Sequence, residues 1–320
     1  MKFEIGEWIH NHQYIYDLSQ SGMYGRIALN KYFQLKSLVN EDDLKGIIAN
    51  INNCGTDQIV ITHGATEAIF TTLYHIHSSG VSRFRTNFPE YEPLYKVPPF
   101  IGLSLGDRGL FVCSNPNNPT GVLHNLPKDY DYYLIDETFL EFSKNLDSMH
   151  YPSNTYRINT FTKFYGGDDL RVGYIIAPDK ESALQLGLLR GIFTEYVSRY
   201  NISVAYQILK DHETLVPYIR EIQQKNFNYL NNLKGKLNFY NGITPSLGTV
   251  SYLDYSQYTD SDSLRLAEDI AKHSISVVPA KFFNHEGTYL RICYSRSNFK
   301  ESYLQLMEYF DSTLSACVES

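Results

Sequence analysis

The 320-residue sequence predicts an α/β fold, with a large domain built on a largely parallel sheet and a smaller α+β domain. Short apolar runs alternate with helical patterns through the middle of the chain, which is typical of a largely parallel sheet. After about residue 235 strands and helices follow in a different order, which indicates a second unit. The length is sufficient for one large and one small domain.

The expected strands are short, apolar and followed by polar or glycine residues. Open α/β sheets bind ligands beyond the carboxyl ends of their strands, so the residues after each run are candidates for a site. The expected strands are QIVIT (58–62), GLFVCS (109–114), YYLID (132–136), RINTF (157–161) and GYIIA (173–177).

Two helices stand between and after these strands. One is predicted from Ala65 to about His77, because apolar residues recur there at helical spacing and Gly80 follows. The other is a long amphipathic pattern over 214–233 that ends before Gly235.

We place the domain boundary inside the long helix. The prediction is a large domain of residues 30–222 and a small domain formed by residues 1–29 and 223–320. In the second part we expect strands at TVSYLDYS, SVVPA and TYLRICYS, a helix near 262–273 and a last helix from about 299.

Charge and hydropathy narrow the function classes. The net charge of −7 argues against nucleic acid or an anionic membrane as a partner, since both favour a basic surface. We expect no membrane span, because no apolar run approaches about 20 residues. The N-terminal MKFEIGEWIHNHQ has no apolar core of a signal peptide, so we expect a cytoplasmic protein.

Cysteines and histidines do not indicate a metal site. Cys54, Cys113, Cys293 and Cys317 are far apart, which fits a reducing compartment. The histidine pairs HNH (10–12) and HIH (75–77) are better explained as surface or core residues, because positions two apart on a helix point to different faces.

Two of the strand ends offer neutral groups suited to a ligand. In THGATEAI (62–69), the backbone N–H groups of Gly64, Ala65 and Thr66 would form a phosphate cradle at the start of a helix, although other strand-to-helix turns look similar. In SNPNNPTG (114–121), prolines fix an extended loop that presents the Asn118 amide; a rigid turn without a ligand is the alternative.

Two further strand ends carry charges. Asp136 ends the apolar run YYLID, so it needs a cationic partner, a proton or a role as a helix N-cap. Lys163 and Arg171 lie on one short loop in TFTKFYGGDDLRVGY (160–174). Two cations this close predict an anion between them.

These four stretches, in this order, resemble the pyridoxal-phosphate (PLP) enzymes of the aspartate-aminotransferase fold, fold type I, and specifically the class I/II aminotransferases. The resemblance covers about residues 55–296. Its pattern is most similar to histidinol-phosphate aminotransferases and threonine-phosphate decarboxylases. It implies PLP as cofactor and a mostly parallel, seven-stranded-type sheet in the large domain.

The resemblance assigns a cofactor role to each charged residue. Lys163 would form the Schiff base with the cofactor aldehyde and later move a proton. Asp136, the second catalytic residue, would pair with the ring nitrogen. Arg171 and the Thr160 hydroxyl would bind the phosphate together with the cradle amides.

Three more residues receive roles from the resemblance. Asn118 would hydrogen-bond the ring oxygen O3′ and border the substrate, and Tyr91 would stack on the ring. Arg291 in TYLRICYS would grip the substrate α-carboxylate, or a phosphate in its place; a surface strand arginine is the alternative.

The sequence departs from the family pattern in four places. The N-terminal arm YDLSQSGMYGRI lacks the Asn-Pro turn that is common in these relatives, in a segment that often sets substrate specificity. DETF places Phe139 where these transaminases usually have a tyrosine that donates to O3′, a feature shared with the decarboxylases. The segments between Tyr91 and Asn115 and between Gly121 and Asp136 are short, so we expect them to lack the helices that the family has there. Two acidic residues, Asp168 and Asp169, follow the lysine, and we expect both to point away from the phosphate.

The leading hypothesis is therefore a PLP-dependent aminotransferase that moves an amino group between an amino acid, possibly histidinol phosphate or an aromatic amino acid, and a 2-oxo acid such as 2-oxoglutarate. The alternative is a decarboxylase of L-threonine phosphate. A binding protein without catalysis is disfavoured, because HGATEA does not supply the dinucleotide fingerprint and the lysine is present. The family also implies a homodimer in which Tyr24 or Tyr32 reaches the neighbouring site.

Overall fold

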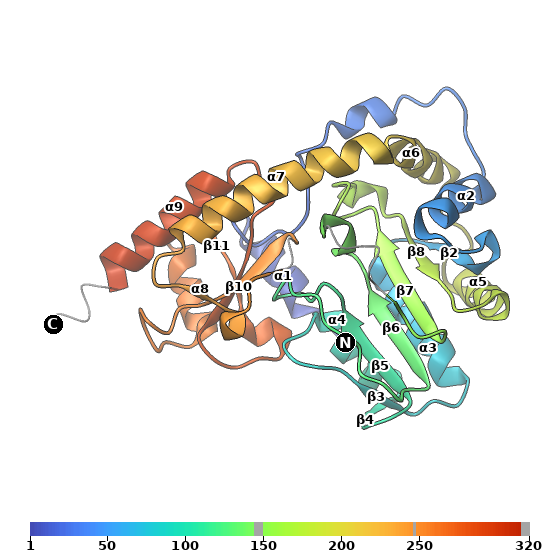
Figure 1. Cartoon of the computed structure of the whole chain (residues 1–320), viewed down its shortest axis with the longest axis horizontal. Coiled ribbons are helices and arrows are strands. Elements are labelled where there is room, and N and C mark those ends of the chain that lie inside the picture. The colour runs from blue at the N-terminus through green and yellow to red at the C-terminus, as the bar shows by residue number, and fades with distance from the viewer. Residues whose placement is uncertain (144–149, 246–247, 315–320) are drawn as a thin grey trace.

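The computed structural model describes residues 1–143, 150–245 and 248–314. In this part of the chain the large sheet has seven strands in the order β2-β8-β7-β6-β5-β3-β4 (Figure 1). Strands β4, β3, β5, β6 and β7 run parallel to one another, whereas β8 runs antiparallel to β7 and β2. The strands are β2 Ile59–Thr62, β3 Arg83–Arg85, β4 Ser104–Leu105, β5 Leu110–Ser114, β6 Tyr132–Asp136, β7 Thr155–Thr160 and β8 Gly173–Ile176.

The five predicted strands are confirmed as β2, β5, β6, β7 and β8. Their residues are almost all buried, as expected for strands covered on both faces. The expectation of a mostly parallel sheet is also confirmed. The edge strands β3 and β4 were not predicted, because they are only three and two residues long and β3 buries Phe84 alone.

Helices cover the sheet and set the positions of its loops. The predicted helix at Ala65 is confirmed as α3 Ala65–Ser78. An N-terminal capping box between Asn40 and Asp43 starts α2. The other helices around this sheet are α2 Glu41–Asn52, α4 Glu92–Phe100, α5 Lys180–Thr194 and α6 Arg199–Lys210.

Helix α4 corrects one expectation. The segment after Tyr91 does form a helix, although EPLYKVPPF contains three prolines. Pro93 lies in the first turn, where the missing N–H group costs nothing, and Leu94 and Val97 are buried against the sheet. The second expectation is confirmed, since residues 122–131 contain no helix.

The long helix α7 His212–Leu233 connects the two halves of the molecule (Figure 1). The first half of α7 contributes Leu215 and Ile219 to the hydrophobic core that also contains residues of α2 and α6. Its second half contributes Phe227 and Leu230 to a second hydrophobic core, formed mainly by the C-terminal region. The elements of that second region are β9 Asn238–Phe239, β10 Val250–Asp254, α8 Ser263–Ala271, β11 Ile275–Ser276, β12 Val278–Pro279, β13 Tyr289–Cys293 and α9 Phe299–Tyr309. The exact domain limits stay a prediction.

The N-terminal segment joins this second region. Strand β1 Tyr16–Asp17 pairs in parallel with β11, and the indole nitrogen of Trp8 in α1 Glu4–Asn11 donates to the Val277 carbonyl at 2.8 Å. The carboxylate of Glu92 accepts hydrogen bonds from the backbone nitrogens of Glu4 and Ile5, both at 2.8 Å, so it satisfies the free donors at the start of α1. These contacts fix α1 beside α4.

Among the described residues, no helix is long and apolar enough to cross a membrane. No group of three or more His, Cys, Asp or Glu side chains in the same residues could hold a metal ion. Cys54, Cys113 and Cys293 are free thiols, and Cys317 lies outside the described residues.

Candidate active site

A cavity of about 270 Å³ lies beyond the carboxyl ends of β5, β6 and β7, between the sheet and the N-terminal segment. It brings together almost every residue that the sequence nominated. The expected residues that line it are Ala65, Thr66, Tyr91, Asn118, Asp136, Thr160, Lys163, Arg171 and Arg291. Gly64 lies directly beside them, at the turn into α3.

The predicted phosphate cradle is formed by the turn from β2 into α3. Gly64 has a φ of 88°, and a Cβ atom there would lie 3.1 Å from Nη2 of Arg171, so only glycine fits this close approach. Ala65 and Thr66 are the first two residues of α3, where backbone N–H groups have no partner inside the helix. The turn is therefore suited to an anion.

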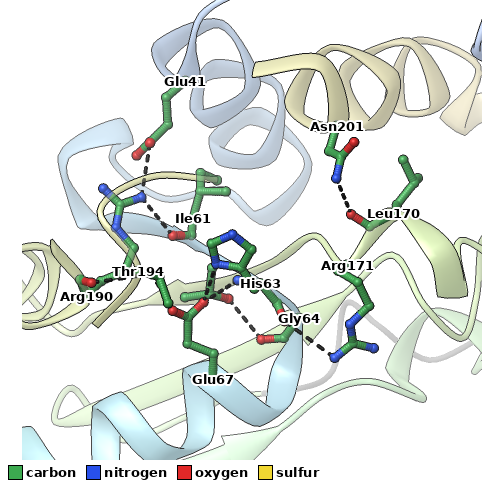
Figure 2. A network of polar contacts seen from close by, with 11 residues as sticks. Glu41, Ile61, His63, Gly64, Glu67, Leu170, Arg171, Arg190, Thr194 and Asn201 are labelled. Carbon is green, nitrogen blue, oxygen red and sulfur yellow. Dashed lines mark hydrogen bonds and ion pairs between the residues drawn. The ribbon is translucent and has the colours of Figure 1, made fainter. Parts of the chain in front are cut away.

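A polar network holds this turn in place (Figure 2). The Glu67 carboxylate accepts from the backbone nitrogen and the ring of His63 and from the Thr194 hydroxyl at 2.7 Å. Arg190 of α5 donates to the Ile61 carbonyl at 3.0 Å and to Glu41 of α2 at 3.1 Å. Three helices thus support the loop from behind, which keeps its front free for a ligand.

Arg171 approaches the same turn from the other side. Its backbone is left-handed, with a φ of 48°, and its Nη2 donates to the His63 carbonyl at 3.5 Å (Figure 2). The preceding carbonyl of Leu170 accepts from Asn201 of α6 at 2.9 Å, which anchors the loop. Thr160 completes this wall, and its hydroxyl contacts the Thr162 hydroxyl at 2.8 Å. A cation, a hydroxyl and a helix start therefore converge.

Asp136 lies at the end of β6 and is almost fully buried. Its Oδ1 accepts hydrogen bonds from the backbone nitrogen of Thr138 at 3.0 Å and from the hydroxyl of Thr138 at 2.5 Å. Burial raises its pKa to about 6, although the Thr138 hydrogen bonds and the charge of Lys163 oppose the rise. The N-cap alternative is not realised, because Phe139 occupies the N-cap position of the next helical turn, Leu140–Phe142.

Lys163 has neighbours at its backbone and at the end of its side chain. Its carbonyl accepts from the backbone nitrogen of Met23 at 2.8 Å, and a Cβ atom on Gly22 would lie 2.9 Å from the Lys163 Cα. Its Nζ lies 3.8 Å from Oδ1 of Asp168. Burial lowers the pKa of Lys163, while Asp168 opposes the change.

Neither Asp168 nor Asp169 lines the cavity, and the expectation that both point away from a phosphate stays a prediction. Asp169 is exposed, whereas Asp168 faces Lys163, because an ammonium attracts a nearby carboxylate.

Arg291 is 1% exposed and projects from β13 into the cavity, so it is not a surface arginine. Its Nη1 donates to Oδ1 of Asn118 at 3.3 Å and its Nη2 to the Ser19 carbonyl, while its Nε has no hydrogen-bond partner among the described residues. Burial lowers its pKa to about 10. Its contacts are neutral oxygens, so the guanidinium retains its affinity for an anion.

The loop 114–121 and Tyr91 form another wall. The Asn118 backbone nitrogen donates to the Ser114 hydroxyl at 2.8 Å, and Ser114 in turn contacts the buried Glu90. Burial raises the pKa of Glu90 to about 8 and that of Tyr91 to about 12. Phe139 also lines the cavity and offers no hydroxyl.

Sequence reasoning missed the contribution of α1, whose residues Ile5, Gly6 and Ile9 line the cavity. The polar residues Gln20 and Ser21 of the N-terminal arm line it as well. Gly22, with a φ of 98°, packs on Lys163, and its carbonyl accepts from Ser295 at 2.7 Å. One sequence signal was present, since the SQSG stretch (19–22) combines small and polar residues, as ligand-binding loops often do.

Comparisons with known proteins agree with this geometry. Histidinol-phosphate aminotransferase 2 of Archaeoglobus fulgidus is 28% identical over 48% of this chain and 49% of its own length, so the matched region spans about half of that relative. A histidinol-phosphate aminotransferase of Clostridium botulinum is 26% identical over 79% of this chain and 77% of its own.

Solved structures match nearly the whole chain. A PLP-dependent aminotransferase of Streptococcus suis has a TM-score of 0.82 at 18% identity, covering 98% of both chains. The aspartate aminotransferase of Thermotoga maritima has a TM-score of 0.75 at 15% identity, covering 97% of this chain and 95% of its own. These likenesses show that the fold is that of PLP-dependent enzymes of fold type I. Residues 71–304 match the family described as aminotransferase class I and II, and the chain belongs to that family.

Proposed function

We propose that this protein is a PLP-dependent aminotransferase that moves an amino group between an amino acid and a 2-oxo acid. The observation that carries the proposal is the meeting of Lys163, Arg171 and Asp136 in one cavity. A buried amine, a cation beside a helix start and a buried carboxylate are three distinct groups, and PLP offers an aldehyde, a phosphate and a ring nitrogen to match them.

The described residues fit this cofactor on structural grounds. The positive φ of Gly64 and the 3.1 Å approach of a Cβ atom there to Nη2 of Arg171 disfavour a side chain at this turn, which suits a phosphate held by Arg171, Thr160 and the first amides of α3. Asp136 is buried and forms no ion pair with any described residue, and a protonated ring nitrogen would supply the missing cation. When bound, the cofactor would supply an electron sink for the substrate Cα.

Side chains of the protein would accept the proton, orient the cofactor ring, exclude water and bind the substrate. Burial lowers the pKa of Lys163, so a larger fraction of its amine is neutral and able to accept a proton at Nζ. Asp136 would hold the ring nitrogen in its cationic form, and Tyr91 would cover the ring and exclude water. Arg291 would bind the substrate carboxylate in a planar, two-pronged contact.

The cavity residues that would not bind the cofactor indicate the kind of amino donor. Lys163 and Arg171 would serve the cofactor, so Arg291 is the cation that remains for the donor's anion. The apolar side chains of Ile5, Ile9 and Phe139 also line the cavity. The names of the curated relatives support histidinol phosphate as a donor, whereas these apolar walls also suit an aromatic or other apolar amino acid, with 2-oxoglutarate as acceptor.

A covalent trapping experiment tests the proposal. The purified protein is incubated with PLP, reduced with borohydride, digested and analysed by mass spectrometry. We expect the pyridoxyl adduct on Lys163 and loss of transamination in Lys163→Ala, with Lys180→Ala as the control because Lys180 is exposed on α5. A Lys163→Ala protein that still transaminates, or the absence of the adduct, would refute the assignment.

One observation keeps a second reaction open. Phe139 lines the cavity at the position where the family's transaminases usually carry a tyrosine, which leaves O3′ of the cofactor with one hydrogen bond fewer. Decarboxylation of L-threonine phosphate is therefore the alternative reaction. Release of CO2 from threonine phosphate, compared with formation of glutamate from 2-oxoglutarate, distinguishes the two.

We also propose that the protein is a homodimer. The outer face and end of α5 expose a group of large apolar side chains, which is the kind of patch that subunit interfaces cover. Tyr24 is 41% exposed, whereas Tyr32 is buried and donates to Asp211 of its own chain at 2.7 Å, so Tyr24 is the better candidate to reach a neighbouring site. The exposed apolar residues are Leu184, Leu188, Ile192, Phe193 and Tyr196.

A further inference from the structure

The loop that follows Lys163 places an acid at the amine. Oδ1 of Asp168 lies 3.8 Å from the Lys163 Nζ, and the two side chains are only 20% and 26% exposed. Oδ2 of Asp168 is buried and has no hydrogen-bond partner in the described part of the chain. A carboxylate in this state is costly unless a cation lies nearby, and Lys163 is that cation.

The position of Asp168 is fixed by the fold. The backbone nitrogen of Gly167 donates to the Phe161 carbonyl at 3.0 Å, and that of Leu170 donates to the Gly167 carbonyl at 3.2 Å. Asn201 of α6 then holds the Leu170 carbonyl. The short turn Asp168–Leu170 is therefore tied to Phe161, the residue after β7, and to α6, which limits the movement of the loop that carries the carboxylate.

The other charges around Lys163 act in both directions. Arg171 and Arg291 disfavour a proton on the amine, whereas Asp168 and, less strongly, Cys293 favour it. Asp136 lines the same cavity and would be engaged with the cofactor ring. Asp168 is thus the carboxylate left to balance two arginines.

We propose that Asp168 is a positioning residue that receives the Lys163 ammonium whenever this lysine is not bonded to the cofactor, and that it raises the affinity of the Lys163 nitrogen for a proton. The inference rests on the proposed function of Lys163. Gly22 packs on the aliphatic part of the side chain and Asp168 faces its end, so the released lysine has a defined resting place. It would therefore stay within reach of the substrate Cα instead of entering solvent.

The size of the effect follows from the distance. A unit charge at about 4 Å changes a pKa by roughly one to three pH units between the limits of bulk water and a protein surface. The pair is partly exposed, which favours the lower end. Removal of the charge should therefore lower the pKa of the Lys163 nitrogen by about one pH unit, a tenfold change in its affinity for a proton.

The first test is a spectrophotometric pH titration of the PLP-loaded protein, whose colour follows protonation of the Lys163 nitrogen. Asp168→Asn removes the charge and keeps the shape of the side chain. Asp169→Asn, one residue on and exposed, is the matched control. We expect a midpoint about one pH unit lower in Asp168→Asn and an unchanged midpoint in Asp169→Asn. An unchanged midpoint in both variants would overturn the inference.

A second measurement does not depend on the cofactor. The cofactor-free full-length proteins are labelled at lysine with acetic anhydride over a range of pH, and mass spectrometry gives the rate at Lys163. At a pH below the pKa, Asp168→Asn should label about tenfold faster than the wild type, and equal rates would contradict the proposal. A wild type that takes up no PLP would instead refute the proposed function, so the two failures can be distinguished.

Discussion

Replacement of Asp136 distinguishes its effect on the stability of the cofactor-free fold from its effect on cofactor binding. The variant Asp136→Asn keeps an oxygen that can accept both hydrogen bonds from Thr138, since Asp136 uses Oδ1 alone for them. It removes only the charge. We expect the cofactor-free variant to be more stable than the cofactor-free wild type at neutral pH, and to gain much less stability from PLP.

The magnitude follows from the pKa of Asp136. Burial raises it from the usual 3.8 to about 6, and each pH unit corresponds to about 1.4 kcal/mol, so the buried charge costs on the order of 3 kcal/mol at neutral pH. The folded chain binds the proton more tightly than the unfolded chain. Stability of the wild type should therefore fall as pH rises from about 4 to about 6 and then stay level with respect to this group.

The assay is urea unfolding of both proteins, without cofactor, at pH 7.5 and at pH 4.5. At pH 7.5 the variant should exceed the wild type by about 2 to 3 kcal/mol. At pH 4.5 the difference should fall to about 1 kcal/mol, because the carboxyl group is then mostly protonated in the folded wild type but still mostly ionised in the unfolded chain. The exposed Asp169→Asn should show neither effect. Repetition with saturating PLP should reverse the order of the two proteins.

One result would refute this reasoning directly. If the cofactor-free variant were equal to or less stable than the wild type at pH 7.5, burial would not be the dominant influence on Asp136. The pairing of this carboxylate with a ring nitrogen would then lose its energetic basis, even if PLP still bound.

Three further predictions concern the lysine, the substrate and the subunit contact. Gly22→Ala should unfold at lower temperature and bind PLP more weakly, because its Cβ would lie 2.9 Å from the Lys163 backbone; Gly25→Ala, also at positive φ but with open space around it, is the control in a thermal melt. Arg291→Lys should raise KM for the amino donor about 10- to 100-fold with little change in PLP affinity measured by absorbance titration, since an ammonium cannot replace the two-pronged guanidinium. Ile192→Asp on α5 should produce monomers in sedimentation, whereas an equivalent change at the exposed Leu304 of α9 should not.

Most of the fold could be predicted because its signals are local. The strands of the sheet centre are apolar runs buried on both faces, and helix α3 has both a periodic pattern and a glycine at its end. Helix α4 could not be predicted in this way. Its prolines are normally helix-breaking, and only the long-range burial of Leu94 and Val97 stabilises it.

The candidate site was likewise predictable only where its residues follow a local pattern. Residues at strand ends, such as Asp136 and Lys163, were found because the edge of a parallel sheet is a known place for ligands. The wall formed by Ile5 and Ile9 was not found, since it depends on Glu92, more than eighty residues away, holding the start of α1. No local pattern reports such a contact.

Burial shifts the pKa of three charged side chains in the cavity toward the neutral form, which is unfavourable unless a ligand compensates for it. Asp136 has a raised pKa, while Lys163 and Arg291 have lowered ones, so each is pushed toward its neutral form by burial. Among the described residues, Asp136 and Arg291 form hydrogen bonds with neutral partners rather than with each other. A fold selected for stability alone would pair or remove them. A ligand with a cationic ring nitrogen, a phosphate and a neighbouring carboxylate restores the charged forms, so its affinity should fall as pH drops through about 6 and Asp136 takes up a proton.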